Sequence, residues 1–252
     1  HLQVFRLVAP ATFELMPMHS EIFLPVNYVS DAASGDFNSD GYPDVVLSTI
    51  GTDGQHAYPR GALDMVFMNR GGRFEVMTLK PERRTMSHGV TVADMNGDGK
   101  PDVVESADFS AALGTSRILI NETPAGAREP VFVEAKSYDT GSFGMGAAIE
   151  DVNQDGILDI YNTSLGRDFL MFGRQGGGYD DKTHELGIAH DWASNVGRVQ
   201  WSPVMTDFNG DGRIDIFIRH GHVTPLDFFG AAATYPQPDL LYLQQEDGTF
   251  IR

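Results

Sequence analysis

The chain has 252 residues, of which 41% are hydrophobic and 21% charged, a balance that excludes a disordered protein. Asp and Glu total 35 against 18 Lys and Arg, and the formal charge of −17 argues against nucleic acid or an anionic membrane surface as a partner. There is no cysteine, which excludes disulfides and thiolate metal sites, and no apolar run of about 18 residues that would predict a membrane-spanning helix.

A nine-residue motif occurs four times along the chain. The copies read DFNSDGYPD, DMNGDGKPD, DVNQDGILD and DFNGDGRID, and they occupy residues 36–44, 94–102, 151–159 and 207–215. They share the template D-x-N-x-D-G-x-x-D, and their starts are separated by 58, 57 and 56 residues. A nearly constant period of this length indicates a repeat architecture.

The segments around each motif repeat as well. After an N-terminal strand segment (1–29), each unit has an apolar stretch, the motif, and a β-branched run such as DVVLSTI or DIFIRHG. A third run such as DMVFMN and a fourth segment that opens with a turn, such as GGRFEVM, complete the unit. We therefore expect four short strands per unit, with the motif as the loop between the first and second strands. Short helical turns are expected only near 109–114 and 181–187.

Four strands at a period above 50 residues are typical of a β-propeller blade, which buries its two faces against neighbouring blades. The predicted fold is all-β: one β-propeller domain (1–252) of four-stranded antiparallel blades, either four-bladed or part of a larger propeller. The expected repeat units are about 30–87, 88–143, 144–200 and 201–252.

The motif has the donor chemistry of a calcium loop. Ca²⁺ takes six to eight oxygen ligands, and positions 1, 3, 5 and 9 supply Asp, Asn, Asp and Asp, while position 7 offers its backbone carbonyl. The Gly at position 6 permits a sharp reversal of the backbone. We therefore predict about four Ca²⁺ sites. The predicted ligands are Asp36, Asn38, Asp40, Tyr42 and Asp44; Asp94, Asn96, Asp98, Lys100 and Asp102; Asp151, Asn153, Asp155, Ile157 and Asp159; and Asp207, Asn209, Asp211, Arg213 and Asp215.

Two other interpretations of the motif were weighed. An EF-hand needs a Glu at position 12 and flanking helices, but position 12 is Leu47, Glu105, Asn162 and Ile218, and strand formers follow the motif. The other alternative is an acidic Asx-turn without a metal. Three carboxylates within nine residues repel one another, which favours the metal.

The loop chemistry also predicts a compartment. The four loops hold 12 of the 35 acidic residues, three in each. A dissociation constant of about 10 μM would stabilise the fold by roughly 2.7 kcal/mol per site at about 1 mM calcium. Such affinities suit a calcium-rich setting, so we expect an extracytoplasmic protein, whether periplasmic, at the cell surface or secreted.

At these loops the sequence resembles the FG-GAP/VCBS repeats, the calcium-binding blades of integrin α-subunit propellers and of many secreted bacterial proteins. Residues 143–189 and the segment DFNGDGRIDIFIRHGHV are similar to the bacterial relatives of cartilage acidic protein (the ASPIC/UnbV group). The resemblance implies the propeller and carries the loop ligands onto the positions given above. Such propellers commonly have seven or eight blades, so either residues 2–8 return to complete the last blade or the chain is part of a longer propeller.

Other candidate residues carry weaker signals. His220 and His222 flank a Gly at the end of an expected strand, and Met16, Met18 and His19, together with a free His1, have the soft donors that suit copper. Trp201 and Trp192 near Arg198 could stack on a sugar, although a packed interface between blades is the commoner role.

No motif for a nucleophile, a zinc protease or a phosphate-binding loop is present. We therefore expect a non-enzymatic, exported calcium-binding propeller that acts as a protein-interaction scaffold, as a peripheral subunit of a larger assembly. The alternative is a carbohydrate-binding protein or a polysaccharide lyase built on a calcium propeller. A third, weaker hypothesis is a copper-binding surface protein.

Overall fold

The computed structural model describes residues 5–15, 28–51, 61–135, 138, 143–189, 199–221 and 237–252. These residues form nineteen strands and one short helix, α1 (Ser110–Leu113), which lies within the helical turn expected at 109–114. Near 181–187 a hydrogen bond from Leu186 N to the Lys182 carbonyl (3.0 Å) closes a turn, but no helix forms. The predicted all-β antiparallel fold is confirmed.

Four of the sheets each contain one copy of the motif, between their first and second strands. The strand order follows the chain in each of them, apart from the short β5, which joins the edge of the second sheet. Sheet 1 consists of β3 (Tyr28–Gly35), β4 (Asp44–Ile50), β6 (Met65–Asn69) and β7 (Phe74–Thr78), and sheet 2 of β8 (Arg84–Ala93), β9 (Asp102–Asp108), β10 (Arg117–Asn121), β11 (Phe132–Glu134) and β5 (Ala62–Leu63). Sheet 3 consists of β12 (Gly144–Glu150), β13 (Asp159–Ser164), β14 (Phe169–Gly173) and β15 (Tyr179–Asp181). Sheet 4 consists of β16 (Val199–Thr206), β17 (Asp215–Gly221), β18 (Leu240–Gln244) and β19 (Phe250–Ile251). The predicted four-stranded unit is therefore present in each repeat.

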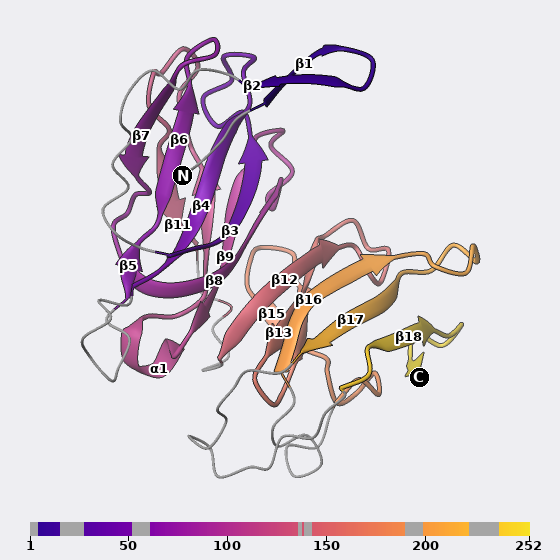
Figure 1. Cartoon of the computed structure of the whole chain (residues 1–252). Helices are drawn as coiled ribbons and strands as arrows, with labels where there is room; N and C mark the ends of the chain where they lie inside the picture. The colour runs from indigo at the N-terminus through magenta and orange to yellow at the C-terminus, as the bar shows by residue number, and fades with distance from the viewer. Residues whose placement is uncertain are drawn as a thin grey trace.

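The N-terminal strand does not complete the last sheet. Instead β1 (Phe5–Ala9) pairs with β2 (Thr12–Leu15) in a hairpin that projects from the top of the molecule in Figure 1. Pairing across a two-residue turn closes a much shorter loop than a return to sheet 4 would, and it therefore costs less chain entropy. Of the two alternatives given above for the last unit, a return of residues 2–8 is ruled out for the described residues 5–8, because they pair with β2 and β19 supplies the fourth strand of sheet 4.

The sheets stand side by side in chain order. The first strands β3, β8, β12 and β16 contact one another in succession, so that sheets 1 and 2 form one half of the molecule and sheets 3 and 4 the other (Figure 1). The first strand of a sheet also contacts the second strand of the preceding sheet, as β8 does with β4. Each pair of neighbours thus shares a face.

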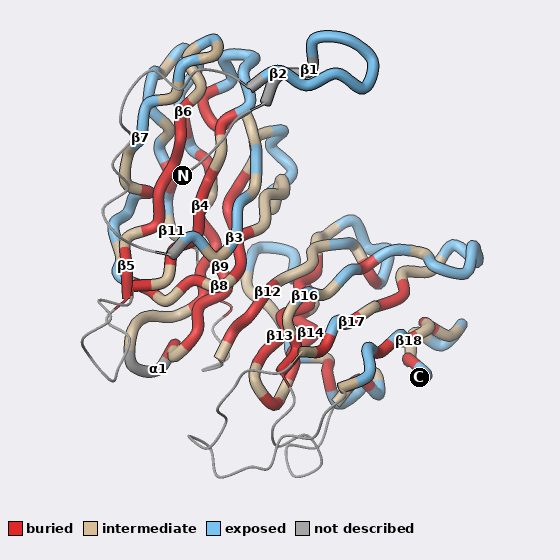
Figure 2. Tube along the Cα trace, in the orientation of Figure 1, coloured by how far each residue is buried: buried red, intermediate tan, exposed pale blue. Residues whose placement is uncertain are grey.

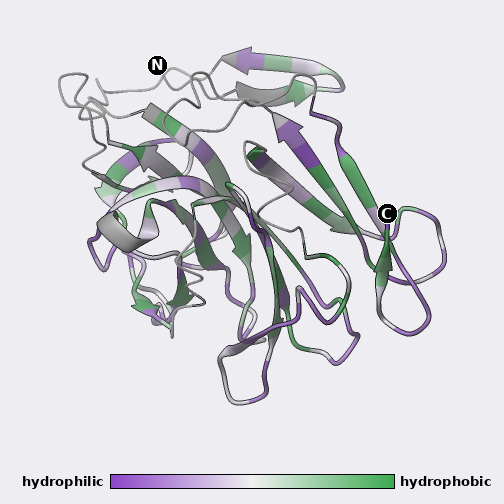
Figure 3. Cartoon of the chain, turned by 90° about the horizontal axis from the view of Figure 1, so that it is seen from below, coloured by the Kyte–Doolittle hydropathy of each residue, from purple (hydrophilic) through white to green (hydrophobic). Residues whose placement is uncertain are grey.

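Hydrophobic clusters fill the spaces between successive sheets. In Figure 2 buried residues follow the middle strands of each sheet, whereas the β1–β2 hairpin is exposed. All seven residues of β9 are buried, because sheets cover both of its faces. Seen from below, the hydrophobic positions lie mainly on the strands, and hydrophilic residues recur in the loops (Figure 3). Representative contacts are Val46, Val66, Val103 and Leu119 between sheets 1 and 2, Val104, Ile118, Ile160 and Phe169 between sheets 2 and 3, and Tyr161, Leu170, Ile216 and Tyr242 between sheets 3 and 4.

Candidate functional site: the four acidic loops

The four copies of the motif, loop 1 (36–44), loop 2 (94–102), loop 3 (151–159) and loop 4 (207–215), share one hydrogen-bond pattern. In loop 1 the position-1 carboxylate of Asp36 accepts the N–H groups of Asp40 (3.0 Å) and Gly41 (2.8 Å). The position-5 carboxylate of Asp40 then accepts the N–H of Tyr42 (3.0 Å). Equivalent bonds occur in the other loops. The carboxylates therefore face the inside of a tightly turned loop.

Two positions of each loop need a left-handed backbone. The position-6 glycines have φ of +83° to +86°, as the sequence predicted. Position 4 is also left-handed, and the sequence analysis missed it: Ser39, Gly97, Gln154 and Gly210 have φ of +57°, +74°, +58° and +78°. The signal was present, because two of these four residues are glycine, which adopts such a conformation without strain.

The position-9 Asp has a structural role that sequence spacing did not show. Asp44 is fully buried, and its two oxygens accept the N–H of Phe37 in the loop (3.0 Å) and the N–H of Asn69 at the end of β6 (2.7 Å). Asp102, Asp159 and Asp215 make the corresponding pair of bonds to their own loop and third strand. Each of these four carboxylates thus fastens a loop to its sheet.

Burial changes the acidity of these carboxyl groups. Desolvation raises the pKa of Asp44 and Asp102, and it raises that of Asp159 to about 6, although backbone N–H bonds oppose the shift. The position-1 Asp207 is half-buried, and its bond from the Gly212 N–H, followed by those from other loop N–H groups, lowers its pKa. A nearby cation would favour the ionised form of every one of these groups.

Positions 3 and 7 complete the predicted ligand set. In loop 1 Asn38 donates from Nδ2 to Asp40 (2.9 Å), while its Oδ1 is buried and accepts no hydrogen bond. In loops 2 to 4 the Asn Oδ1 accepts the position-5 N–H instead. The position-7 residues Tyr42, Lys100, Ile157 and Arg213 all donate their N–H to the position-5 carboxylate, and the Arg213 side chain also binds Asp211.

The structure brings all the predicted ligands of a loop into one nine-residue turn. Their side chains are directed at the loop's own N–H groups, and among the described residues no three His, Asp or Glu side chains converge as a preformed metal cluster. The donor set is nevertheless the oxygen-only kind that Ca²⁺ prefers, and a carboxylate oxygen that accepts one N–H keeps a second lone pair. The buried, unpartnered Oδ1 of Asn38 is also an oxygen that needs an electropositive partner.

Each of the first three loops is packed against the following sheet. The position-2 side chains of Phe37 and Val152 are buried in the clusters shared with sheets 2 and 4, and Met95 packs against the cluster shared with sheet 3. Two amides on third strands reinforce this contact: Asn121 Nδ2 donates to the Phe37 carbonyl (3.0 Å) and Gln244 Nε2 to the Val152 carbonyl (3.2 Å). The loops therefore lie at the joints between sheets.

Loop 4 is not covered by a sheet among the residues that the structure describes. Phe208, which occupies position 2, is 47% exposed, whereas Phe37 at the same position of loop 1 is 0% exposed. In sheet 4, Val204, Phe217 and Leu241 are paired side by side on its first three strands, as Ala33, Val46 and Val66 are in sheet 1. Val46 and Val66 are buried against sheet 2, but Val204 and Leu241 are 45% and 39% exposed. We call the set Val204, Phe208, Phe217, Leu241 and Ile251 the sheet-4 face.

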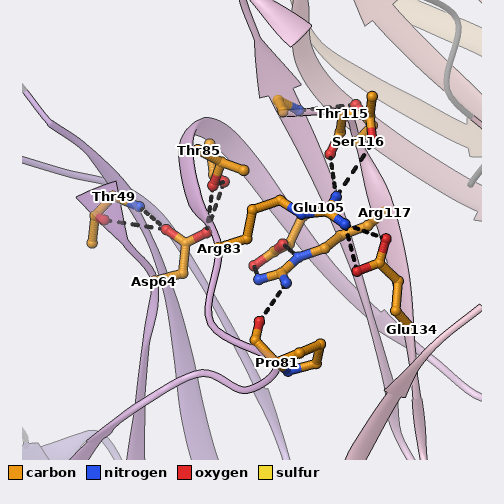
Figure 4. A network of polar contacts seen from close by, with 12 residues as sticks. Thr49, Asp64, Pro81, Arg83, Thr85, Glu105, Thr115, Ser116, Arg117 and Glu134 are labelled. Atoms are coloured by element: carbon orange, nitrogen blue, oxygen red, sulfur yellow. Dashed lines mark hydrogen bonds and ion pairs between the residues drawn. The ribbon is translucent and has the colours of Figure 1, made fainter. Parts of the chain in front are cut away.

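A second polar cluster is buried between sheets 1 and 2 (Figure 4). Asp64 accepts hydrogen bonds from Thr49 N (2.6 Å) and Ser87 Oγ (2.7 Å), and Arg117 forms an ion pair with Glu105. Burial and the neighbouring Glu105 raise the pKa of Asp64 well above its ordinary value. Asp64, Glu105 and Arg117 are each 1% exposed, so this cluster is closed to a substrate and serves to join the sheets.

The weaker candidates from the sequence fall into two groups. His220 is buried in β17, and Trp201 lies in β16 with a half-buried ring. His1, Met16, Met18, His19, Trp192, Arg198 and His222 lie outside the described residues. His88, which the sequence analysis did not single out, pairs with Asp108 (Nε2 to Oδ2, 3.3 Å) and lies edge to face against Trp201.

The search for candidate membrane spans, made over the described residues, finds no helix of sufficient length and apolar character. No curated protein matches the chain. The model of a protein family described as an FG-GAP-like repeat matches residues 36–105 and 151–218, which together make up more than half of the sequence. Both matches begin at the first Asp of an acidic loop and continue into the strands that follow. The chain therefore belongs to the FG-GAP-like repeat family.

Proposed function

We propose that the protein is an exported, calcium-binding β-propeller that acts as a non-catalytic scaffold for a protein partner, as a peripheral subunit of a larger assembly. The observation that carries this proposal is the contrast between loops 1 to 3, which are packed against the next sheet, and loop 4, whose apolar face is open. The sheet-4 face is apolar like the faces that pack between sheets, and an exposed apolar surface of this kind is suited to bind another protein.

In this proposal each loop holds one Ca²⁺ through the side chains at positions 1, 3, 5 and 9 and the carbonyl at position 7. When bound, the ion supplies two positive charges that offset the three carboxylates of the loop. The loop's own contribution is to hold its oxygens on a backbone fixed by the left-handed residues at positions 4 and 6. Because the loops lie at the joints between sheets, the ion would stabilise the arrangement of neighbouring sheets.

Loop 2 offers a clean test of the calcium sites. Asp98 is exposed, and its Oδ1 accepts the N–H of Lys100 (2.9 Å), a bond that an Asn side chain would retain. Asp98→Asn therefore removes a charge and an anionic ligand without opening the turn. Isothermal titration should find about four calcium sites in the wild type, one of them weakened at least about tenfold in Asp98→Asn. The matched control is Glu82→Gln, an exposed acidic residue outside the loops.

Chelation gives the second readout. Addition of EDTA should lower the melting temperature of the wild-type protein, and calcium, added back at about 1 mM, should restore it. A titration without calcium heat, together with a melting curve that EDTA does not change, would remove calcium from the proposal.

The binding surface is tested separately, in the presence of calcium. Leu241→Asp places a charge in the centre of the sheet-4 face, and Phe13→Asp places one on the exposed β1–β2 hairpin. A partner identified by cross-linking and then purified should form a stoichiometric complex with the wild type and with Phe13→Asp but not with Leu241→Asp. Equal binding by all three proteins would show that the sheet-4 face is not the binding surface.

The alternative function, carbohydrate binding, has support of its own from a cavity that the first strands of the four sheets line. The localisation outside the cytoplasm follows from the calcium proposal and is tested with it.

A further inference from the structure

The first strands of the four sheets share an irregularity. In each of them the pairing with the second strand slips by one residue at the position six residues before the first Asp of the loop. In β3, β8 and β12 this position is the one unpaired residue, and in β16 it is the first of two, Trp201 and Ser202. The slips fall between Val29 and Asp31, between Ser87 and Gly89, between Gly144 and Gly146, and between Gln200 and Pro203. The bulged residues are Ser30, His88, Met145 and Trp201. A β-bulge redirects a side chain away from the regular alternation of the strand, and bulges are frequent beside binding sites.

All four bulged residues line one cavity of about 320 Å³. The strands β3, β8, β12 and β16 thus contribute the same repeat position to a single hollow. This volume lies at the lower end of the range of about 300–1,000 Å³ that is usual for small-molecule sites.

Glycines allow these strands to approach one another at the cavity. A Cβ on Gly89 would lie 2.9 Å from the Gly146 Cα, and a Cβ on Gly146 would lie 2.6 Å from the Trp201 carbonyl oxygen. Both distances are shorter than real Cβ contacts, so no larger residue fits without a shift of the backbone. The convergence of the four bulges is therefore built into the sequence.

The cavity wall combines an aromatic ring with hydrogen-bonding groups that already have one partner each. His88 Nε2 faces Asp108 Oδ2 at 3.3 Å, so in the neutral tautomer Nε2 donates and Nδ1 remains an acceptor. The Asp31 oxygens accept the N–H groups of Ala32 (2.8 Å) and Val90 (3.1 Å), and each oxygen keeps a lone pair. The Trp201 ring, in edge-to-face contact with His88, supplies an apolar surface.

The charge of the wall selects against ionic ligands. None of the described residues that line the cavity is Lys or Arg, and the chain carries −17, so an anion such as a uronate or a phosphate would be repelled. A cation gains little, because the wall has one carboxylate, Asp31, and its two oxygens already accept backbone N–H groups. The acceptors suit hydroxyl groups, and the indole suits the apolar face of a sugar ring.

We propose that this cavity binds the pyranose ring of a neutral sugar, with Trp201 packed against the ring and Asp31 and His88 as acceptors for its hydroxyl groups. This site is distinct from the acidic loops and from the sheet-4 face, and it depends neither on calcium in the loops nor on a protein partner.

The test uses a panel of ligands with the whole protein. Isothermal titration with glucose, galactose, mannose, fucose and N-acetylglucosamine, each up to about 50 mM, is compared with glucuronate and with tetramethylammonium. Binding of at least one neutral sugar, and of neither ionic probe, is expected. In a Trp192→Phe variant Trp201 is the sole tryptophan, so the sugar that binds should change its fluorescence.

Variants locate the site. Trp201→Ala should weaken the affinity about tenfold, which corresponds to about 1.4 kcal/mol, because it removes the apolar surface on which the sugar ring packs. Ser202→Phe, which fills the cavity from an exposed position, should block binding while it leaves the half-buried indole in place. Phe13→Ala removes an exposed aromatic ring outside the cavity and should bind like the wild type. The far-UV circular dichroism and melting temperature of each variant are recorded, and Ser202→Phe decides the question if Trp201→Ala does not fold.

Three results would overturn the proposal: no neutral sugar binds, tetramethylammonium or glucuronate binds in place of the sugars, or the sugar affinity is unchanged in Ser202→Phe. Repeating the titration with Asp98→Asn separates this site from the loops: a variant that loses one calcium site but stays folded should bind the sugar like the wild type.

Discussion

Phe37 and Phe208 occupy the same position in two copies of one loop, yet Phe37 is 0% exposed and Phe208 is 47% exposed. The difference comes from the neighbours. Phe37 lies in a cluster with Val90, Val103 and Leu119 of sheet 2 and packs edge to face on Phe132 at 5.5 Å, whereas loop 4 has no covering sheet among the described residues.

The two phenylalanines should therefore differ in their effect on stability. Phe37→Ala leaves a cavity between two sheets and should lower the free energy of unfolding by about 3–5 kcal/mol. Phe208→Ala should change it by less than about 1 kcal/mol. Urea denaturation of both variants measures this, and equal losses would contradict the assignment of Phe37 to a joint between sheets.

The left-handed backbone at position 4 predicts a stabilising substitution. Ser39 is exposed and has φ of +57°, a conformation that is unfavourable for a residue with a Cβ. Ser39→Gly should raise the free energy of unfolding by about 0.5–1 kcal/mol. The matched control is Ser34→Gly in the extended strand β3, which should lower it by a similar amount. Denaturation curves that move in the same direction for both variants would disprove the role of backbone strain.

Asp168 should make stability depend on pH. It is buried beside Tyr161, whose hydroxyl donates to Oδ2 (2.9 Å), and desolvation raises its pKa from 3.8 to about 7. The folded state thus holds the proton more tightly than the unfolded state does. The resulting stabilisation is fully present below about pH 4 and is lost as the pH rises through 7, a total of roughly 4 kcal/mol at about 1.36 kcal/mol per pH unit.

Asp168→Asn isolates this effect, because an Asn oxygen can still accept the N–H of Ser164. The free energy of unfolding of the variant relative to the wild type should increase between pH 4.5 and 8.5 at a fixed calcium concentration. Parallel pH profiles for the two proteins would show that Asp168 has no raised pKa.

The buried ion pair between Arg117 and Glu105 supports a double-variant experiment. Arg117→Leu leaves Glu105 without its partner, next to the carboxyl group of Asp64, and should lower the free energy of unfolding by about 3–5 kcal/mol. Arg117→Leu combined with Glu105→Gln removes both charges and should recover most of this loss. If the double variant is as unstable as the single one, the loss is due to packing and not to the unpaired charge.

The sequence by itself determined the parts of this protein that depend on local chemistry. The period of 56 to 58 residues, the four strands per unit and the place of the acidic loops follow from turn residues and β-branched runs, which act over a few residues. The sharp turn at the position-6 glycine was predicted for the same reason. The left-handed backbone at position 4 could also have been predicted, because two of the four loops have glycine there. The sequence left open whether residues 2–8 complete the last sheet, and the structure rules this out for Phe5–Ala9, which pair with β2 because it is closer along the chain.

Only the tertiary structure decided how the four repeats differ in burial and in their contacts with one another. Phe37 and Phe208 have the same local sequence, but burial depends on the sheet that stands in front of each. The position-9 carboxylates gained their second bond from a third strand up to 29 residues away. The four residues that line the cavity from the bulges differ in type, so no sequence motif could group them (Ser30, His88, Met145 and Trp201). Their common place at an irregularity in four neighbouring strands brings them together. Contacts between residues distant in sequence are set by how the sheets pack, and that information lies in the whole chain rather than in any one repeat.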